Sequence, residues 1–343
     1  MERKPFISVI MPVYNAEQYV KQAVESVLSQ TFTDLEIICV NDASSDDSLS
    51  ILLDLQNADS RVKVIDSSEN VGAGGARNLG LEAANGSYIT FMDADDAIEP
   101  DLYERAAAVA KSDDVDEVVW GLIEEHYDAA DRLVRTVPIV PKALTVTEPR
   151  ELTELIVKLE EDTLFGYQWN SLYRAEIIEE HQIRFEKALF YEDYFFNLDF
   201  AKHMRSLATM DFAGYHYFKR VNASITHRFT KDYFDLSYRR VESMYKFCCD
   251  CECVDQTVYT VLGNKLLRYT LSALSRNHNP LAQMGWKQQQ QWAKEQIKRP
   301  LYSDLLSQAH VSNPAFSVLR FLIRHRLGWL MVWMGKIVFS IMR

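Results

Sequence analysis

The sequence has no excess of basic residues and no regular cysteine pattern. Its 37 Lys and Arg residues stand against 49 Asp and Glu residues, so the formal net charge is −12. Non-specific binding to nucleic acid needs a basic surface that displaces counterions from the phosphates, so this class of function is disfavoured. Four of the five cysteines fall within Cys248–Cys253. This crowding is untypical of a disulfide framework, and zinc ligation stays an alternative that the spacing disfavours.

Targeting signals and repeats are also missing. Met1–Pro5 is charged and a strand-like run begins directly at Phe6, so we expect no secretory signal and a reduced, cytoplasmic protein. There is no internal repeat and no low-complexity tract. Hydrophobic residues make up 48% of the chain and aromatic residues 12%, which is enough to build a substantial core.

Acidic residues are absent after Asp304, where an apolar and basic segment follows. Its basic residues are Arg320, Arg324, Arg326, Lys336 and Arg343. Lys336 interrupts the apolar run, so a transmembrane span of about 20 residues is not available. Two interpretations stay open for Phe316–Arg343. One is an interfacial amphipathic helix, peripheral on the cytoplasmic face of the membrane and drawn to anionic lipid; the other is a helix packed on the body or in a dimer interface.

The first 120 residues alternate between strand-like and helix-like runs. Apolar strands are expected at 6–13, 35–40, 61–65, 88–92 and 115–120, with helices between them, one of which Asp46 can cap. This alternation predicts parallel β-α-β units in a sheet covered on both faces. From residue 121 the rhythm breaks, and beyond about residue 230 the pattern is helical. The sequence therefore predicts an α/β fold followed by a helical region.

Three polar clusters follow the predicted strands: Tyr14-Asn15, Asn41-Asp42 and Asp93–Asp96. Ligands of parallel sheets gather at the carboxyl ends of the strands. Asp93 and Asp95 are two residues apart, so an extended segment places both carboxylates on one face, where they repel unless a cation lies between them. Magnesium or manganese would suit these oxygen ligands and leave positions for a diphosphate. The alternative is a solvated acidic turn before the next helix.

The glycine-rich stretch Gly72–Gly75 follows a predicted strand and opens a helix, as in a dinucleotide-binding oxidoreductase. However, the third glycine of that fingerprint is missing. The stretch also follows the third strand, whereas the fingerprint occupies the first strand–helix turn. One acid would serve a ribose, but three stand in the cluster at Asp93–Asp96. An oxidoreductase is therefore disfavoured.

Four segments of the first hundred residues together resemble the nucleotide-sugar domain of family 2 glycosyltransferases, which have the GT-A fold and invert the anomeric centre. They are Ile7–Asn15, Val40–Asp46, Asn70–Gly80 and Phe91–Asp96, and they occur in the family's order and with similar spacing. Three later segments are similar to family motifs. They are the acceptor-side segment Trp169–Arg174, the catalytic acid pair Glu192-Asp193, and a closing motif of Tyr217, Arg220 and Ser224–Thr226.

The resemblance implies roles for the matching residues. The nucleotide-sugar would be bound by Pro12, Tyr14, Asn15, Asp42, Arg77 and Asp93, with Tyr14 stacking on the base. Asp95 would ligate Mn²⁺ or Mg²⁺, with Asp93 and His216 as further ligands. Asp193 would be the general base, and Trp169 and Glu192 would hold the acceptor. Two alternatives stay open: His216 as a packed residue, and Glu192 and Asp193 as acids that merely favour a helix N-terminus.

Taken together, the residues and the resemblance predict an inverting, metal-dependent glycosyltransferase. It would move a sugar from a nucleotide diphosphate, with UDP favoured, to a hydroxyl of a carbohydrate or lipid-linked acceptor in cell-surface polysaccharide or glycolipid synthesis. Residues 1–226 would form the GT-A domain, with a nucleotide-sugar half at 1–120 and an acceptor half at 121–226, and 227–343 would form the helical region. The alternatives are an inactive nucleotide-sugar-binding module and a sugar nucleotidyltransferase. The latter would need a lysine-bearing glycine loop where Pro12–Asn15 stands.

Overall fold

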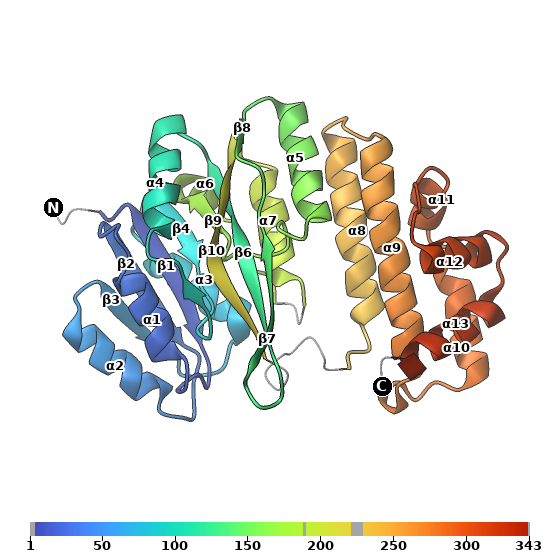
Figure 1. The fold of residues 1–343 in the computed structure, drawn as a ribbon, viewed down its shortest axis with the longest axis horizontal. Helices are drawn as coiled ribbons and strands as arrows, with labels where there is room; N and C mark the ends of the chain where they lie inside the picture. The colour runs from blue at the N-terminus through green and yellow to red at the C-terminus, as the bar shows by residue number, and fades with distance from the viewer. Residues whose placement is uncertain (1–3, 188–189, 221–228, 342–343) are drawn as a thin grey trace. The chain divides into compact units, whose positions relative to one another are not determined.

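The computed structural model describes residues 4–187, 190–220 and 229–341. The chain divides into two compact units, Met1–Ser224 and Ile225–Arg343. The first unit is built on a sheet, and the second contains helices, as Figure 1 shows. The predicted domain boundary after residue 226 and the segment Ser224–Thr226 lie outside the described residues, so both stay predictions.

Within the described part of the first unit, ten strands form one mixed sheet. Along the sheet the order is β3-β2-β1-β4-β9-β6-β10-β5, with β7 on β6 and β8 on β10. The strands are β1 Ile7–Val13, β2 Leu35–Asn41, β3 Val62–Asp66, β4 Tyr88–Phe91, β5 Ala97–Ile98, β6 Glu117–Tyr127, β7 Leu133–Ile139, β8 Leu144–Val146, β9 Ser171–Arg174 and β10 Leu207–Arg220. The α/β class predicted from the sequence is confirmed.

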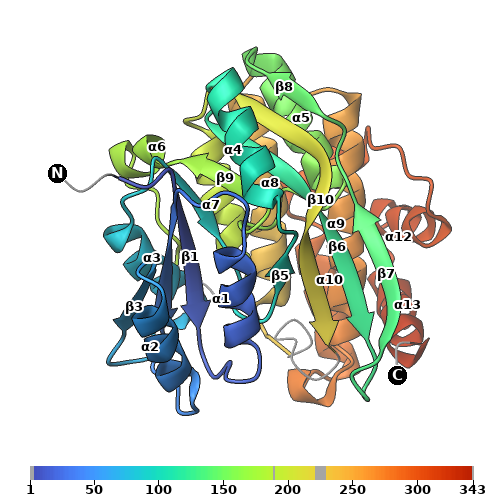
Figure 2. The ribbon, with the colours of Figure 1, turned by 60° about the vertical axis from the view of Figure 1, so that its left-hand side comes forward.

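Seven helices cover this sheet in the described part of the unit (Figure 2). They are α1 Val20–Leu28, α2 Ser48–Ala58, α3 Gly72–Ala83, α4 Leu102–Asp113, α5 Pro149–Glu161, α6 Ala175–Glu180 and α7 Glu192–Ala201. Asp46 accepts a hydrogen bond from the amide of Ser48, the first residue of α2, although Asp47 occupies the N-cap position. Before α4 begins at Leu102, the amide of Glu99 donates to the carbonyl of Gly214 in β10, which ties this segment to the sheet.

The strand order places the carboxyl ends of β1 and β4 at a topological switch point. Strands β1, β2 and β3 follow one another toward one edge of the sheet, whereas the chain returns past them to form β4 on the other side of β1. Right-handed crossovers therefore put α1 and α2 on one face and α3 on the other. Ligands of such sheets generally bind outside the strand ends where the order reverses. The polar clusters after β1, β2 and β4 all lie at the carboxyl ends of these parallel strands.

Strand β1 is buried and central, and its sequence suits that place. Its β-branched residues pair in parallel with β2 on one side and β4 on the other. Pro12 has no amide hydrogen to give to a ladder, but the pairing of β1 with β4 stops at Ile10, before Pro12 is reached. Pro12 therefore lies just beyond the point where β1 leaves β4.

The places of β9 and β10 in the sheet could not be predicted from the alternation of strands and helices in the first 120 residues. Strand β9 lies between β4 and β6 and runs antiparallel to both. Strand β10 is parallel to β6 over most of its length. Through these pairings, β9 and β10 lie in the same sheet as the strands of the nucleotide-sugar half that was predicted for residues 1–120.

The second unit is helical in its described part, 229–341. Its helices are α8 Tyr233–Asp250, α9 Gln256–Arg276, α10 Trp286–Gln296, α11 Pro300–Leu306, α12 Pro314–Arg324 and α13 Gly328–Ile341, with the short 3-10 helix η2 Pro280–Ala282. In the part of the chain that the structure describes, no helix is both long enough and apolar enough to cross a membrane. Cys248 and Cys253 are buried, whereas Cys249 and Cys251 are exposed, and all four are free thiols.

Gly80 fixes the approach of α3 to the sheet, which gives a first prediction. A Cβ atom at Gly80 would lie 2.3 Å from Cγ2 of Ile10 in β1, so only glycine permits this contact. We expect Gly80→Ala to lower the free energy of unfolding by about 1–3 kcal/mol, because overpacking exceeds the gain in helix propensity. Glu82→Ala on the exposed side of the same helix is the matched control and should change it by less than about 0.5 kcal/mol. Equal stabilities of the two variants in urea unfolding would contradict this packing.

Candidate active site

The loop after β1 presents Tyr14 to solvent and is held by Asn15. Tyr14 is 55% exposed at the carboxyl end of the strand, and an exposed aromatic ring can stack on a planar ligand. The side-chain oxygen of Asn15 accepts a hydrogen bond from the backbone amide of Ser45, and the backbone amide of Asn15 donates one to the hydroxyl of Ser44. Asn15 therefore joins the loops that follow β1 and β2. Its predicted contact with a nucleotide stays a prediction.

Asp42, at the carboxyl end of β2, organises the start of α3. Its two carboxylate oxygens accept hydrogen bonds from the amides of Val71 and Gly72, at 2.7 and 3.0 Å. Asp42 is buried, so its side chain holds the glycine-rich turn in place. Recognition of a base by Asp42 stays a prediction.

The acidic cluster after β4 consists of Asp93, Asp95 and Asp96, each in a different environment. Asp96 is buried and accepts hydrogen bonds from the hydroxyl of Tyr215, at 2.8 Å, and the amide of Phe218. Burial raises the pKa of Asp95 to about 6, and the negative charge of Asp93 adds to this effect. The cluster is therefore more than a solvated turn, because its carboxylates are partly withdrawn from water and act on one another.

Arg77 in α3 is the cation that joins two acids from distant parts of the chain. Its side chain is only 5% exposed. One guanidinium nitrogen, Nη2, donates to Asp93 at 2.9 Å, and the other, Nη1, donates to Asp193 at 2.9 Å. Glu192 lies further away, 3.9 Å from Nη1. Arg77 therefore brings the acid at the end of β4 and the acid at the start of α7 to the two sides of one planar group.

Glu192 and Asp193 lie in the first turn of α7, as the alternative of two acids at a helix N-terminus predicted. The place of Asp193 in a helix turn does not, however, explain why its carboxyl group is buried and paired with Arg77. Burial raises the pKa of Asp193 to about 7, although the charge of Arg77 acts in the opposite direction. A carboxyl group with a pKa near neutrality can take up a proton at physiological pH, which is what a general base must do.

Gln168 completes this arrangement and was not singled out by the sequence. It is buried, and with its amide oriented to satisfy both neighbours it accepts from Nη2 of Arg77 at 2.7 Å and donates to Asp193 at 3.0 Å. Asn78, next to Arg77, exchanges two hydrogen bonds of 2.9 Å with the backbone of Phe185. The only sequence signal for Gln168 was its place next to Trp169, whereas Asn78 lies within the segment Asn70–Gly80 that resembles the family.

Trp169 lies in a buried stack of aromatic rings below the acidic cluster. Its ring is stacked with those of Tyr215, at 4.0 Å between centroids, and Tyr167, at 4.5 Å. The hydroxyl of Tyr215 donates a hydrogen bond to Asp96 and accepts one from the backbone amide of Asp93. The aromatic stack therefore holds the acidic cluster in place. Contact between Trp169 and an acceptor stays a prediction.

His216 is engaged by two glutamates. Its Nδ1 atom lies 2.7 Å from Glu125, and its Nε2 atom lies 3.1 Å from Glu99. These contacts tie β10 to β6 and to the segment after β5. Metal ligation by His216 stays a prediction, and in this structure both ring nitrogens already have carboxylate partners.

The donor set fits a hard divalent cation held by few protein ligands. Among the residues that the structure describes, no three His, Cys, Asp or Glu side chains are grouped to hold a metal ion. Asp93 and Asp95 nevertheless offer carboxylate oxygens whose charges act on one another. Burial is the main cause of the raised pKa of Asp95, and repulsion by Asp93, which a cation would relieve, adds to it. Magnesium typically binds one or two carboxylates and completes its shell with water and phosphate oxygens.

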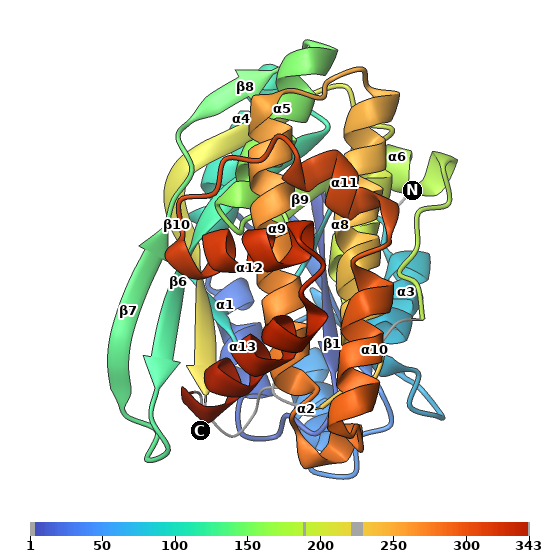
Figure 3. The same cartoon turned by 90° about the vertical axis from the view of Figure 1, so that its right-hand side faces the viewer.

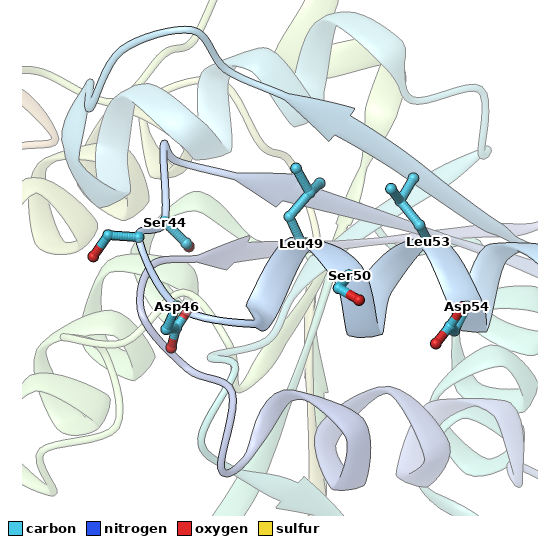
Figure 4. A pocket seen from close by; sticks show the side chains of 7 residues that line it. Ser44, Asp46, Leu49, Ser50, Leu53 and Asp54 are labelled. Atoms are coloured by element: carbon cyan, nitrogen blue, oxygen red, sulfur yellow. The ribbon is translucent and has the colours of Figure 1, made fainter.

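A pocket beside α2 contains none of the predicted site residues. Figure 4 shows side chains from the loop after β2 and from one face of α2 around it. They are Ser44, Ser45, Asp46, Leu49, Ser50, Leu53 and Asp54. Both its acids are unsuited to bind a phosphate, so the arrangement around Arg77 remains the candidate active site.

Comparisons with known proteins bear on this arrangement. Residues 8–182 match the family model described as glycosyl transferase family 2. The chain is 33% identical over 220 residues to the uncharacterized glycosyltransferase EpsJ of Bacillus subtilis (strain 168), covering 64% of this chain and 62% of EpsJ. It is 32% identical over 204 residues to the uncharacterized glycosyltransferase YibD of Escherichia coli (strain K12), covering 57% and 56%. The chain thus spans less than two thirds of the length of these relatives.

A solved structure supports the fold. The crystal structure of S. aureus TarS 1–349 in complex with UDP superposes with a TM-score of 0.68, covering 99% of this chain and 92% of that one at 19% identity. At this identity the likeness concerns the fold. The GT-A architecture predicted from the sequence, with a helical region after it, is confirmed.

Removal of the Arg77 charge gives a prediction for stability and its pH dependence. Arg77→Met leaves Asp93 and Asp193 close together without a cation, so we expect a loss of about 3 kcal/mol at pH 8. The folded-state pKa of Asp193 is already above the unfolded value, and the substitution raises it further. Ionisation then costs stability as pH rises, so the loss should be smaller at pH 5 than at pH 8.

Arg105→Met is the matched control for this substitution. Arg105 forms an exposed ion pair with Asp101 one helical turn away, and its removal should cost less than about 1 kcal/mol at either pH. Urea unfolding of the two variants at both pH values is the measurement. Equal losses, or a loss in Arg77→Met that grows on acidification, would contradict the arrangement.

Proposed function

The chain belongs to glycosyl transferase family 2, and from this premise we propose that it is an inverting transferase that moves a sugar from a UDP-sugar to a hydroxyl group. The observation that carries this proposal is the position of Arg77 between Asp93 and Asp193. Asp93, where we expect the donor to bind, and Asp193, whose pKa is raised to about 7, flank the same guanidinium group. An inverting displacement needs a base that takes the proton of the acceptor hydroxyl, on the side of the reacting carbon opposite the leaving diphosphate.

Asp193 is the proposed general base. As the acceptor hydroxyl attacks the anomeric carbon, its proton passes to the carboxylate of Asp193. A bond then forms between the acceptor oxygen and that carbon, and the bond from the carbon to the diphosphate oxygen breaks with its electron pair going to the diphosphate. Attack from the side opposite the leaving group inverts the anomeric centre, which passes through an oxocarbenium-like state. Glu192 is proposed to position the acceptor.

The donor is proposed to lie across the carboxyl ends of β1, β2 and β4. The exposed ring of Tyr14 would stack on the base, and Arg77 would attract the phosphates. Asp95 and Asp93 would hold Mn²⁺ or Mg²⁺, which when bound neutralises charge on the leaving diphosphate. The complex of TarS with UDP supports the choice of a uridine donor.

The acceptor is proposed to be a cell-surface polysaccharide or a lipid-linked glycan. The basic and apolar helices α12 and α13 support this class, because a surface that contacts lipid would bring the enzyme close to such acceptors.

Substitutions of the two acids separate donor binding from chemistry. Asp95→Ala should abolish metal-dependent binding of UDP. Asp193→Asn should leave that binding within about twofold but lower turnover of the donor roughly 10²–10⁴-fold, because the base is lost and the donor contacts remain. The measurements are calorimetric titration with UDP and Mn²⁺, and turnover across a panel of nucleotide-sugars.

Asp199→Asn on the exposed side of α7 is the control for Asp193→Asn and should keep normal turnover. Wild-type activity in Asp193→Asn would remove it as the base. A wild-type chain that binds UDP with manganese but turns over no donor would identify the inactive binding module instead.

The pKa of Asp193 predicts the pH dependence of the reaction. Only the carboxylate form accepts a proton, so kcat/KM should rise with pH up to about 7 and level off above it. A profile measured at saturating metal tests this. An acid limb centred near pH 4, the ordinary range for an aspartic acid, would contradict the assignment.

A further inference from the structure

Helix α13 carries a row of exposed apolar side chains, here called the apolar stripe. It consists of Trp329, Trp333, Ile337 and Ile341, which are 51%, 47%, 57% and 77% exposed. Residues four apart are neighbours on a helix surface, so the four positions drift by only about 120° around the axis. Single exposed apolar residues are ordinary on proteins, whereas a contiguous row marks an interaction surface.

The other side of α13 is already packed within its own unit. Met331 and Val332 are buried, and Nε2 of His278 lies 3.0 Å from the carbonyl oxygen of Val332. A Cβ atom at Gly335 would lie 2.6 Å from the carbonyl oxygen of Leu274 in α9, so the two helices are in close contact. Figure 3 shows α13 lying across α9 beside α10 and α12. The stripe is therefore the outward face of a fixed helix.

Helix α12, which contacts α13, also carries exposed apolar side chains. Its buried side consists of Leu319, Leu322 and Ile323, whereas Val318 and Phe321 are more than half exposed. The two helices thus both turn an apolar side toward their unit and show further apolar side chains to solvent.

The charge of this region is opposite to that of the chain as a whole. Residues 305–343 contain no Asp or Glu, although the formal net charge of the chain is −12. Arg324, Arg326 and Lys336 are exposed. The ammonium group of Lys336 lies 5.1 Å from the ring centroid of Trp333. Tryptophan beside a lysine with an apolar stem is the combination that membrane–water interfaces favour.

We propose that the apolar stripe and its flanking basic residues dock the protein on a bilayer that contains anionic lipid, with α13 in the plane of the interface. The apolar side chains enter the boundary between headgroups and acyl chains. Arg324, Arg326 and Lys336 stay at the level of the anionic headgroups and are attracted to them.

A second copy of the chain is the less suitable occupant of this surface. Two-fold pairing through the stripe would bring the same basic residues of both copies together. Residues 305–343 contain no acidic residue to compensate them, so like charges would face one another. An anionic bilayer supplies the missing opposite charge and covers the apolar side chains at the same time.

The test is sedimentation of the full chain with vesicles of phosphatidylcholine, alone or mixed with phosphatidylglycerol. We expect binding to the mixed vesicles that weakens as salt rises, and much weaker binding to phosphatidylcholine alone. The pair Trp329→Ser and Ile337→Ser should lower the partition coefficient roughly tenfold or more. The pair Arg324→Gln and Lys336→Gln should lower it by about fivefold for each charge.

The matched control is the pair Leu133→Ser and Val134→Ser at the exposed start of β7. These residues are 51% and 62% exposed, so the control removes a similar apolar area away from the stripe and should bind like the wild type. Circular dichroism checks folding, and turnover of a soluble donor should be unchanged in all variants. Vesicle binding without donor turnover would contradict the proposed enzyme function and leave the docking surface intact.

Three results would overturn the docking proposal. The folded wild type could stay in the supernatant with both kinds of vesicle, or the stripe variants could bind as well as the wild type. The wild type could also be a dimer that becomes monomeric in the stripe variant without any binding to vesicles, which would assign the stripe to a second copy of the chain.

Discussion

The buried guanidinium of Arg77 is the interaction on which the candidate site depends. An arginine keeps its charge at any physiological pH, so a side chain that is only 5% exposed is tolerable only with carboxylates around it. Asp93 and Asp193 supply that charge, each at 2.9 Å. Asp93 follows β4 and Asp193 lies in the first turn of α7, so one ion triad joins the expected donor side to the expected acceptor side.

The fold makes this triad possible through strands that lie far apart in the sequence. Strand β9 pairs with β4, and this pairing brings the chain near Gln168 to the acidic cluster that follows β4. In addition, Asn78 holds the backbone of Phe185 beside α3. The same arrangement sets the chemistry. Burial raises the pKa of Asp193 toward neutrality, while the neighbouring positive charge keeps an ionised form accessible. Support of the fold and preparation of a base are thus two effects of the same contacts.

The sequence predicted the parts of this structure that depend on local pattern. Apolar runs gave β1 to β4, and the polar residues after them marked the edge where Tyr14, Asp42 and Asp93 lie. It could not predict that β9 separates β4 from β6, because strand pairing between distant segments leaves no local signal. The triad was missed for the same reason, since Arg77 and Asp193 are 116 residues apart. Only the family resemblance had marked them both as site residues.

A double-mutant cycle on Arg77 and Asp193 tests this account most directly. The free energies of unfolding of Arg77→Met, Asp193→Asn and the double variant are compared with that of the wild type. If the guanidinium and the carboxyl group depend on one another as the contacts indicate, the cycle should give a coupling energy of about 1–3 kcal/mol. Effects that add to within about 0.5 kcal/mol would contradict the claim that this ion pair holds the two sides of the site together.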